Sequence, residues 1–413
     1  MLFVCGTAES ASAILVKQSS ATASRPRQIM AGDLISDNKR ILILPFGDKW
    51  KRYRKILHEA LTPAMARNYE PIQQEEATRT AVAIGQDPAT FQHQFRRYAA
   101  SVIMTVAYDY RVKDISDPLV TAVEENGFQL GYWIKPGASP LDTYALLNWL
   151  PLPLNPWKRI GKELHAKELD LFLGVYRDTR QRALRGEAGS CFSTLLQEKQ
   201  AQHGLTDEEA CYLSGSLFGA GSDTSSSALA IFVMAMITHP DVVTKAQAEL
   251  DKVIGSQRLP TFQDQDDLPY LRALCQEVHR WRPVSSGGFQ HQLTEDVTYR
   301  DYVLPKGSAI VGNHWSIHLD PAEYPEPDVF KPERFLDEEG QVRGTAHSPK
   351  GHFQFGFGRR VCVGLNVAER SVYINAAIML WAFDFRAPDG RIDLVDTLAF
   401  TNSANSHPLP FKA

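Results

Sequence analysis

Cysteine is scarce in this sequence, with five cysteines among 413 residues. They are Cys5, Cys191, Cys211, Cys275 and Cys362, which lie far apart and form no CxxC or Cys/His cluster. This spacing excludes a disulfide framework and a zinc site built on cysteines. Lone cysteines in a long chain usually behave as small buried apolar side chains. We expect this of all of them except Cys362.

Long apolar runs and an excess of positive charge are also missing. No segment reaches the ~18 to 20 apolar residues that a membrane-spanning helix needs. The first residues lack the basic start and the sustained apolar core of a signal peptide. A formal net charge of -4 lacks the basic excess that nucleic-acid binding requires. We therefore expect no nucleic-acid partner and no anchor in this chain.

Gly/Ser linkers, internal repeats and low-complexity tracts are absent as well. A hydrophobic content of 44% and a charged content of 22% are ordinary for a globular protein. Length alone would suggest two or three domains at ~150 residues each. Because nothing divides the chain, we expect a single domain over residues 1–413.

The clearest helical pattern covers residues 206–239. Thr206 and Glu209 form a capping box at its start, and Pro240 closes its end. This length far exceeds the average of ~11 to 12 residues, so the helix should cross the whole molecule. Its middle, residues 219–227, is small and polar. We expect this stretch to line a cavity.

The other elements predict a mainly α protein with a minor β region. Residues 268–281 and 363–383 are expected to be helices, the former ending before Pro283. Leu2–Cys5 is expected to be a strand that leads through a turn into a helix. Short β-rich runs within residues 296–313, broken at residues 305–307, predict hairpins of a small sheet. Residues 320–335 are rich in proline and predict a stiff meander.

Residues 355–364, with the sequence FGFGRRVCVG, place Cys362 just before a helix N-terminus. Unpaired N–H groups and the helix dipole favour an anion at such a position. Arg359 and Arg360 lie next to it, so we expect the thiol pKa to be lowered and the thiolate favoured. Gly358 and Gly364 allow the backbone to bend closely around the sulfur.

This loop resembles the FxxGxRxCxG loop of the haem-thiolate monooxygenases of the cytochrome P-450 family. Phe355, Gly358, Arg360, Cys362 and Gly364 fit every fixed position of that loop. Segments that resemble the family's other motifs are Glu277 with Arg280 (ExxR), residues 332–335 (PERF), residues 220–225 (AGSDTS, the oxygen-activation segment) and Trp50 with Arg54 (WxxxR). These motifs occur in the family's order, and their style is similar to the fungal microsomal branch. The implied fold is that of cytochrome P-450, with haem between the long central helix and the cysteine loop.

The resemblance implies haem b as cofactor, with Cys362 as its axial thiolate and metal ligand. Arg360 is expected to pair with a haem propionate. Trp50 and Arg54 share a helix face and would supply further donors, although alone they also fit a cation-π surface pair. His291 is a further candidate for this task.

The remaining parts of the cofactor site are also implied by the resemblance. Phe355, Gly358 and Gly364 shape the loop against the haem. Gly221 is expected to permit a local bulge in the central helix. Thr224 would hydrogen-bond at the oxygen site and Asp223 would relay protons, which makes them the candidate catalytic residues. The alternative is that residues 222–227 form only a strip of small packing residues.

Glu277, Arg280 and Arg334 resemble the buried ion-pair triad of the family. In the family it locks the meander beneath the cysteine loop.

The implied reaction inserts one oxygen atom from O2 into a lipophilic small molecule, a secondary metabolite or a xenobiotic. Electrons would come from an NADPH-cytochrome reductase (diflavin), because no flavin or NADPH fingerprint follows the haem motif. A basic docking patch for it, or equally a solvated charged face, would consist of Lys51, Arg52, Lys55, Lys350 and Arg359. Substrate would contact residues 30–44, Phe218, Ala220, residues 284–289 and residues 400–405.

Location follows only from the resemblance, which implies the cytosolic face of the endoplasmic reticulum membrane. Relatives carry an apolar anchor, a hinge and a first helix and strand before the point where this chain starts, so we expect an N-terminally truncated form with Leu2–Cys5 at an exposed sheet edge. Without a spanning segment a cytoplasmic location stays open. Residues 146–157 favour a core loop broken by prolines over a membrane-dipping loop.

Three functions therefore remain open. The complete motif set favours the monooxygenase. A haem-thiolate isomerase or dehydratase of peroxides would not need Asp223 and Thr224. An inactive truncated haem-binding fragment is the third.

Overall fold

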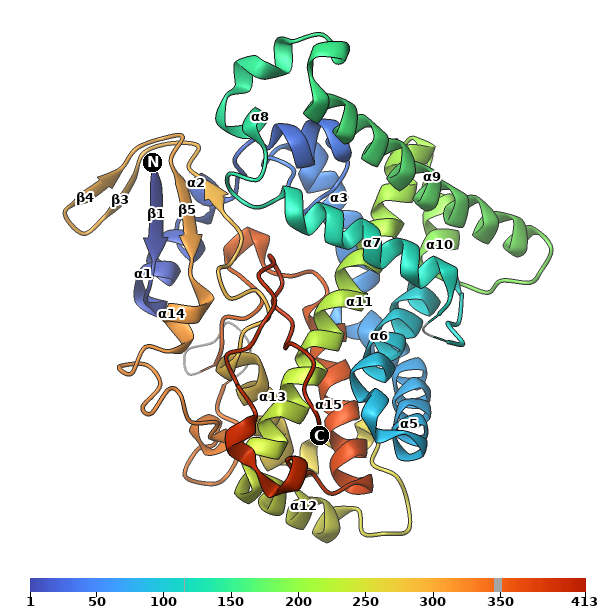
Figure 1. The fold of residues 1–413 in the computed structure, drawn as a ribbon, viewed down its shortest axis with the longest axis vertical. Helices are drawn as coiled ribbons and strands as arrows, with labels where there is room; N and C mark the ends of the chain where they lie inside the picture. Colours follow the sequence, from blue (N-terminus) through green and yellow to red (C-terminus); the bar gives the residue numbers. More distant parts are fainter. Residues whose placement is uncertain (115, 345–350) are drawn as a thin grey trace.

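The computed structural model describes residues 1–114, 116–344 and 351–413, and helices dominate it (Figure 1). The α-helices are α1 (Ala8–Ala11), α2 (Ser19–Thr22), α3 (Asp48–Leu61), α4 (Pro63–Asn68), α5 (Glu70–Gln86), α6 (Phe91–Tyr108), α7 (Pro118–Trp133), α8 (Pro140–Thr143), α9 (Pro156–Leu184), α10 (Phe192–Lys199), α11 (Asp207–Thr238), α12 (Pro240–Val253), α13 (Pro269–Trp281), α14 (His314–His318) and α15 (Leu365–Ala382). Turns of π-helix are η1 (Ser12–Val16) and η2 (Ile29–Ile35). Turns of 3-10 helix are η3 (Pro88–Thr90), η4 (Ala145–Trp149), η5 (Leu152–Leu154), η6 (Phe262–Asp267), η7 (Pro332–Phe335), η8 (Gly358–Arg360), η9 (Pro388–Gly390) and η10 (Ile392–Leu394).

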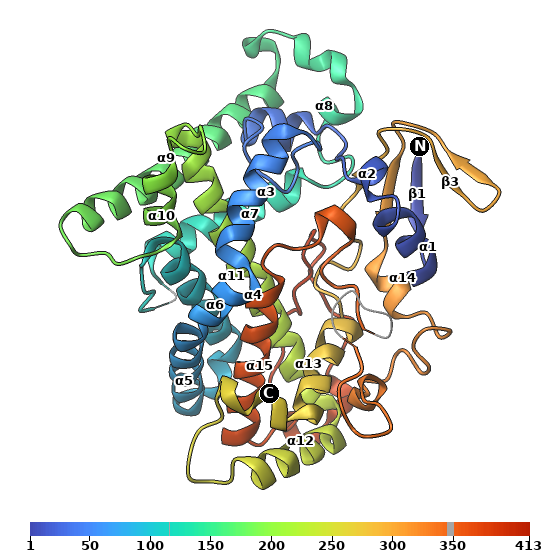
Figure 2. The same ribbon diagram turned by 180° about the vertical axis from the view of Figure 1, so that it is seen from behind.

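The long helix α11 runs through the middle of the molecule (Figures 1 and 2). Its capping box is present: Thr206 Oγ1 accepts from the Glu209 N–H at 3.1 Å, and Glu209 accepts from the Thr206 N–H at 3.2 Å. Residues 228–237 belong to one hydrophobic core with α5, α6, α12, α13 and α15, whereas residues 210–218 belong to another with α3, α9 and α10. The polar middle, residues 219–227, contributes to neither core. The predicted helix is confirmed.

Among the described residues, α11 is also the one helix that is long and apolar enough to cross a membrane. Of its most apolar window, 78% is buried inside the protein. This burial identifies α11 as a core helix, since a lipid-facing helix would expose its apolar side chains. The predicted helices that correspond to α13 and α15 are confirmed within two residues at each end.

The strands lie to one side of the helices (Figure 1). β1 (Leu2–Cys5) pairs in parallel with β5 (Ala309–Gly312), which pairs antiparallel with β2 (His291–Gln292). β1 is therefore an edge strand of this sheet, as expected. β3 (Val297–Tyr299) and β4 (Tyr302–Leu304) form a separate hairpin.

The prediction of hairpins throughout residues 296–313 is therefore right for β3 and β4 but wrong for β5. Gly307 has φ +82° and its N–H donates to the Leu293 carbonyl at 2.8 Å. This turn redirects the chain after β4, so that β5 pairs with β1 instead of continuing the hairpin.

The interpretation of residues 146–157 as a core loop is wrong. The side chains of Leu146, Trp149 and Leu154 are 75%, 85% and 67% exposed. Asn155 is buried and caps α9, its side chain accepting from the Lys158 N–H at 2.9 Å. The segment thus lies in short 3-10 turns outside the core and leaves Leu146, Trp149 and Leu154 largely uncovered.

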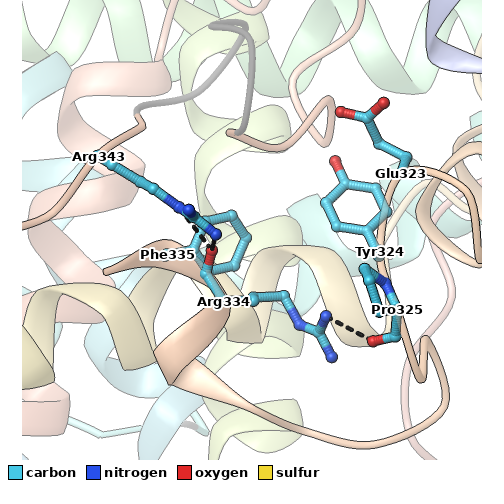
Figure 3. A pocket seen from close by; sticks show the side chains of 6 residues that line it. All are labelled: Glu323, Tyr324, Pro325, Arg334, Phe335 and Arg343. Carbon is cyan, nitrogen blue, oxygen red and sulfur yellow. Dashed lines mark hydrogen bonds between the residues drawn. The ribbon is translucent and has the colours of Figure 1, made fainter. Parts of the chain in front are cut away.

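A buried ion-pair triad fastens the meander, as predicted. Glu277 on α13 binds Arg280 (Oε2 to Nε, 2.6 Å) and Arg334 (Oε1 to Nε, 3.0 Å). Arg334 also donates to the Pro325 carbonyl at 2.9 Å, and Arg343 donates to the Arg334 carbonyl (Figure 3). The guanidinium groups thus gather backbone carbonyls of the meander around one carboxylate.

The meander also holds the start of the cysteine loop. The Tyr324 hydroxyl donates to the Gly351 carbonyl at 2.7 Å, and the Phe353 N–H donates to His318 Nε2 at 2.9 Å. The pocket drawn in Figure 3 lies beside this junction and is lined by residues of the meander and by Arg343, with none of the predicted cofactor or catalytic residues. Arg280 of the triad donates to the His318 carbonyl at 2.8 Å, so the triad is linked through His318 to the start of the cysteine loop.

Buried histidines make the fold sensitive to acid. Burial lowers the pKa of His279 and of His314 to about 4, and it lowers the pKa of His291 and His318 well below the usual value. Below the unfolded pKa of ~6.5, the unfolded chain binds protons that the folded chain refuses, so stability falls as pH falls from ~6.5 towards 4. Burial also lowers the pKa of His239. It raises the pKa of Glu369 to about 7, and raises those of Glu124, Glu249 and Asp142, which acts in the opposite sense.

We expect the free energy of unfolding to decrease between pH 7 and pH 5.5, with up to about 1.4 kcal/mol per pH unit for each buried histidine. Urea titrations at pH 7.5, 6.5 and 5.5 measure this slope. His279→Phe should reduce this slope, because phenylalanine takes up no proton in the unfolded chain. Neither ring nitrogen of His279 has a hydrogen-bond partner among the described residues, so the substitution breaks no hydrogen bond. His58→Gln, at an exposed position, should leave it unchanged. A wild-type stability that is flat over this range contradicts the prediction.

Candidate active site

Cys362 lies in the loop that leads into α15. Its N–H donates to the Phe355 carbonyl at 2.8 Å, which closes the loop. Its thiol accepts backbone hydrogen bonds from Gly364, the residue that precedes α15, and from Leu365. Cys362 is exposed, whereas the other cysteines are buried, as predicted. The structure therefore presents one thiol outside the packed cores, at a helix N-terminus.

The predicted electrostatics of this thiol need a correction. Burial raises the Cys362 pKa, because enough protein surrounds the sulfur to disfavour a charge. The Gly364 and Leu365 N–H groups and the charge of Arg54 offset this only in part. Arg359 and Arg360 do not lower this pKa as expected; the cation that faces the thiol is Arg54 of α3. A bound metal ion would itself deprotonate a coordinating thiol.

The bend of the loop depends on Gly358. Its φ is +54°, and a Cβ there would lie 2.2 Å from the Leu15 carbonyl oxygen of η1. Any side chain would therefore meet both backbone strain and a steric clash. Phe355 lies on the other side of the loop, with its ring centroid 5.2 Å from that of His279. The close approach at Gly358 packs the loop against the N-terminal elements.

Arginine side chains from three segments lie close together: the charges of Arg25 and Arg54 act on Arg360, and the charge of Arg54 also acts on the thiol. Arg360 donates to the carbonyls of Ala23 (2.6 Å) and Leu44 (2.6 Å), and its guanidinium lies 4.4 Å from the ring centre of Trp50. Burial, helped by the charges of Arg25 and Arg54, lowers the Arg360 pKa to about 8. The positive charge at this point is therefore poorly compensated by protein groups.

Arg25 and Arg54 share this lack of an anionic partner. Arg25 donates to the carbonyls of Phe289 (3.1 Å) and Gln290 (2.6 Å), and burial lowers its pKa to about 10. Arg54 is half-buried and has neither a hydrogen bond nor an ion pair among the described residues. No described carboxylate forms an ion pair with Arg25, Arg54 or Arg360.

His291 belongs to the same group. Its Nδ1 lies 2.9 Å from the Thr22 carbonyl, so Nδ1 carries the proton and Nε2 of the neutral ring is a hydrogen-bond acceptor. Burial, followed by the charge of Arg25, lowers its pKa well below the usual value. The indole N–H of Trp50 has no acceptor among the described residues. The donors that the site offers to an anion are therefore the guanidinium groups and the Trp50 indole, whereas His291 lies beside them as a neutral ring.

This donor set fits the haem that the motifs imply. Two propionates are carboxylates, and unpaired buried guanidinium groups form strong charge-assisted hydrogen bonds with such groups. A thiol that already accepts two N–H bonds fits an axial thiolate. Arg25 is a further donor that lies in none of the sequence motifs. No sequence signal separates it from Arg27, which is exposed and pairs with Asp33 at 2.6 Å.

The predicted bulge at Gly221 is wrong, because α11 is a regular α-helix over its whole length. A Cβ at Gly221 would lie 2.8 Å from Cγ1 of Ile103. The glycine therefore allows α6 to approach α11 closely. Ala220 next to it is exposed although it lies in the middle of this central helix.

Thr224 and Asp223 are half-buried on the same stretch of α11. The Thr224 hydroxyl donates to the Ala220 carbonyl at 2.9 Å, so its oxygen can still accept a hydrogen bond. Asp223 binds His407 (Oδ1 to Nε2, 2.7 Å) and Asn405 (Oδ2 to Nδ2, 2.9 Å). The sequence analysis missed both partners, since an isolated His and Asn near a C-terminus carry no motif.

The structure joins three of the regions that were expected to contact substrate. Asn405 Oδ1 accepts from the Ser285 hydroxyl at 2.7 Å, and the Ser406 N–H donates to the Val284 carbonyl at 2.7 Å. Because Asn405 also donates to Asp223, residues 284–289 and 400–405 are both linked to α11. Phe218 is buried in the core instead.

Acidic side chains neutralise part of the positive charge of the expected basic patch. Arg52 pairs with Glu209 at 3.1 Å, and Lys51 pairs with the exposed Asp48 at 3.2 Å. Lys51 and Arg359 lie over the Phe46 ring, at 5.3 and 5.5 Å from its centre, and Lys55 is exposed. Lys350 lies outside the described residues. The exposed cations of this surface are therefore Lys51, Lys55 and Arg359.

Comparisons with known proteins agree with this geometry. The family model described as Cytochrome P450 matches residues 1–411. The chain is similar to Cytochrome P450 monooxygenase 64 of the fungus Postia placenta, with 42% identity over 409 residues that cover 99% of this chain and 81% of the relative. Cytochrome P450 monooxygenases 88 and 113 of the same fungus are also 42% identical, over 99% of this chain and 81% of each relative. The chain belongs to the cytochrome P450 family, mainly α-helical monooxygenases that bind haem through a cysteine thiolate and incorporate oxygen from O2.

Proposed function

We propose that residues 1–413 form one haem domain in which the Cys362 thiolate would hold the haem, and that it hydroxylates a lipophilic small molecule, a secondary metabolite or a xenobiotic. The observation that carries this proposal is the meeting of the Cys362 thiol with cationic groups that have no anionic partner, chiefly Arg54. When bound, a haem thiolate supplies the redox chemistry that activates O2 and favours O–O cleavage.

The protein's own residues hold the cofactor in this proposal. The guanidinium groups of Arg25, Arg54 and Arg360 would bind the propionates, with the Trp50 indole as a further donor and His291 beside them. The Gly364 and Leu365 N–H groups stabilise the negative charge on Cys362. Phe355 and Gly358 fix the loop through the contacts described above.

Asp223 and Thr224 would manage protons and water. The Thr224 hydroxyl donates its proton to the Ala220 carbonyl, so its oxygen is free to accept a hydrogen bond. Asp223 is held ionised and can accept and release a proton. This acid and alcohol pair favours the monooxygenase over an isomerase or dehydratase, which has no need of delivered protons.

P450 monooxygenases take electrons from a redox partner. We propose a diflavin NADPH-cytochrome reductase as the partner, which would dock on the surface of Lys51, Lys55 and Arg359. Positive charge on this surface complements an acidic partner and would steer its approach.

The proposal is tested by reconstituting the haem-loaded chain with a diflavin reductase, NADPH and a panel of apolar probes such as 7-ethoxycoumarin. We expect NADPH-dependent formation of an oxygenated or dealkylated product from at least one probe. A haem-loaded chain that oxidises none of them contradicts the proposed substrate class. Turnover with a ferredoxin system but not with the diflavin reductase contradicts the proposed partner.

Thr224→Ala should uncouple the reaction. We expect NADPH consumption to continue while product per NADPH falls about tenfold and hydrogen peroxide rises, because the site loses a group that holds protons and water in place. Thr238→Ala is the matched control, since its hydroxyl makes the same bond to the carbonyl four residues earlier, at 2.7 Å from Met234. Equal coupling in Thr224→Ala and wild type contradicts the assigned role.

The exposed apolar segment of η4 and η5 supports contact with a membrane, and the family is often membrane-associated. We propose that this segment enters the cytosolic leaflet of the endoplasmic reticulum, because Trp and Leu side chains favour the interface. Replacing Leu146, Trp149 and Leu154 by serine should reduce co-flotation with phosphatidylcholine vesicles several-fold. Flotation equal to that of wild type contradicts this proposal.

A further inference from the structure

The Asp223 carboxylate is held by the last part of the chain. His407 Nε2 lies 2.7 Å from its Oδ1, and the Asn405 amide donates to its Oδ2 at 2.9 Å. Each oxygen of the carboxylate therefore has its own partner, and one of these partners can itself gain and lose a proton. The C-terminal segment, drawn in red, lies beside α11 (Figure 1).

This segment is firmly placed. The Thr401 N–H donates to the His407 carbonyl at 2.8 Å, and the His407 N–H donates to Thr401 Oγ1 at 3.0 Å. The Ser227 hydroxyl of α11 donates to the Ser406 carbonyl at 2.7 Å. The position of the His407 imidazole therefore follows from a turn that is tied to α11 at two points.

Charged groups from two further helices surround the pair. Burial raises the pKa of Glu124 on α7, and the charges of Arg96, Asp223, His407 and His93 also act on it. His93, Arg96 and Glu124 are exposed. The pair therefore lies within electrostatic reach of exposed charged groups on α6 and α7.

Asp223 itself stays ionised in this setting. Burial would raise its pKa, but the hydrogen bond and charge of His407, with the Asn405 amide and the charge of Arg96, hold it below the usual value. An ionised carboxylate bonded to an imidazole is an acceptor that can be reprotonated from the imidazole without moving.

We propose that His407 is the residue that delivers protons to Asp223, an inference that rests on the proposed monooxygenase function. The Nε2–H bond of the imidazolium breaks and a bond to Asp223 Oδ1 forms. Asp223 then releases this proton into the site, and the neutral imidazole regains one from solvent water, which its partly exposed side chain can reach. Each cycle moves one proton inward and leaves both residues as they began.

The first test compares His407→Gln with wild type in the haem-loaded protein. Gln keeps a hydrogen-bond donor but cannot carry a proton. We expect NADPH-driven turnover of a probe such as 7-ethoxycoumarin to fall about tenfold, with a changed pH profile, since proton delivery contributes at least this much to such reactions. Turnover driven by hydrogen peroxide should stay unchanged, because peroxide brings its own protons and electrons.

Ser227→Ala is the matched control, because it removes the other tie between α11 and the same turn. It should leave both kinds of turnover near wild type. A loss in Ser227→Ala equal to that in His407→Gln would show that the turn, and not the imidazole, matters. Unchanged NADPH-driven turnover and pH profile in His407→Gln would equally overturn the inference.

A second test does not depend on turnover. A double-mutant cycle of Asp223→Asn and His407→Gln, read by urea unfolding of the haem-loaded protein, should show a coupling between the two residues, because they share a direct hydrogen bond at 2.7 Å. Additive effects of the two substitutions would overturn the inference. If the wild-type protein oxidises no probe, with either NADPH or hydrogen peroxide, but the cycle shows the coupling, the proposed monooxygenase function is rejected. The interaction between Asp223 and His407 then still stands.

Discussion

Replacing Cys362 by alanine is expected to abolish the strongly red-shifted absorption band that the reduced, carbon-monoxide-bound protein shows when a thiolate binds the haem iron. Turnover with NADPH should be lost with it, because no other described cysteine is exposed. The remaining donors around Arg54 would still favour the propionates, so some haem would bind without its thiolate. The absorption spectrum and the haem content per chain measure these two effects separately.

Cys275→Ala is the control for this experiment. Cys275 is buried in the hydrophobic core, and burial raises its pKa, so it is an inert apolar side chain. The variant should keep the band and lose at most ~1 to 2 kcal/mol of stability for the small cavity. A red-shifted band that persists in Cys362→Ala would show that another residue is the ligand.

Replacing Glu277 by glutamine is expected to cost on the order of 3 to 5 kcal/mol of stability and to prevent haem retention. Arg280 and Arg334 both bind this fully buried carboxylate, and the Lys331 N–H donates to it at 2.8 Å. Glutamine keeps the shape of the side chain but leaves two guanidinium groups without a counter-charge. An uncompensated buried charge is strongly destabilising. Urea unfolding and haem content per chain check both parts.

Glu326→Gln is the matched control in the same meander. Glu326 pairs with Lys331 at 3.3 Å, and the two side chains are 66% and 48% exposed. An exposed ion pair contributes less than ~1 kcal/mol, so this variant should retain haem and stability. Wild-type haem occupancy in Glu277→Gln would show that the triad does not support the cysteine loop.

Much of the secondary structure could be predicted because its signals are local. The capping box of Thr206 and Glu209 and the proline after α11 define the ends of that helix within the sequence itself. The strand Leu2–Cys5 and the hairpin of β3 and β4 were predictable for the same reason. The pairing of β5 with β1 was not, because it joins residues about 300 positions apart.

The burial of apolar segments was predicted less well. Residues 146–157 and the buried part of α11 both contain many Leu and Trp or Phe side chains, yet only the second is inside. Periodicity describes one segment, whereas burial depends on which other segment covers it. The absence of a bulge at Gly221 has a similar cause, since the demand for a small residue comes from Ile103 on another helix.

The sequence by itself determined the family, the haem-thiolate chemistry and the candidate ligand Cys362, because these depend on residue types at fixed spacing within short motifs. Only the tertiary structure decided which charges meet. It brings Arg54 rather than Arg359 or Arg360 to the thiol, adds Arg25 to the donors, and places His407 on Asp223. The reason is physical: the strength of a charge–charge contact depends on distance and burial, and the chain folds residues that are far apart in sequence to within a few ångströms of each other.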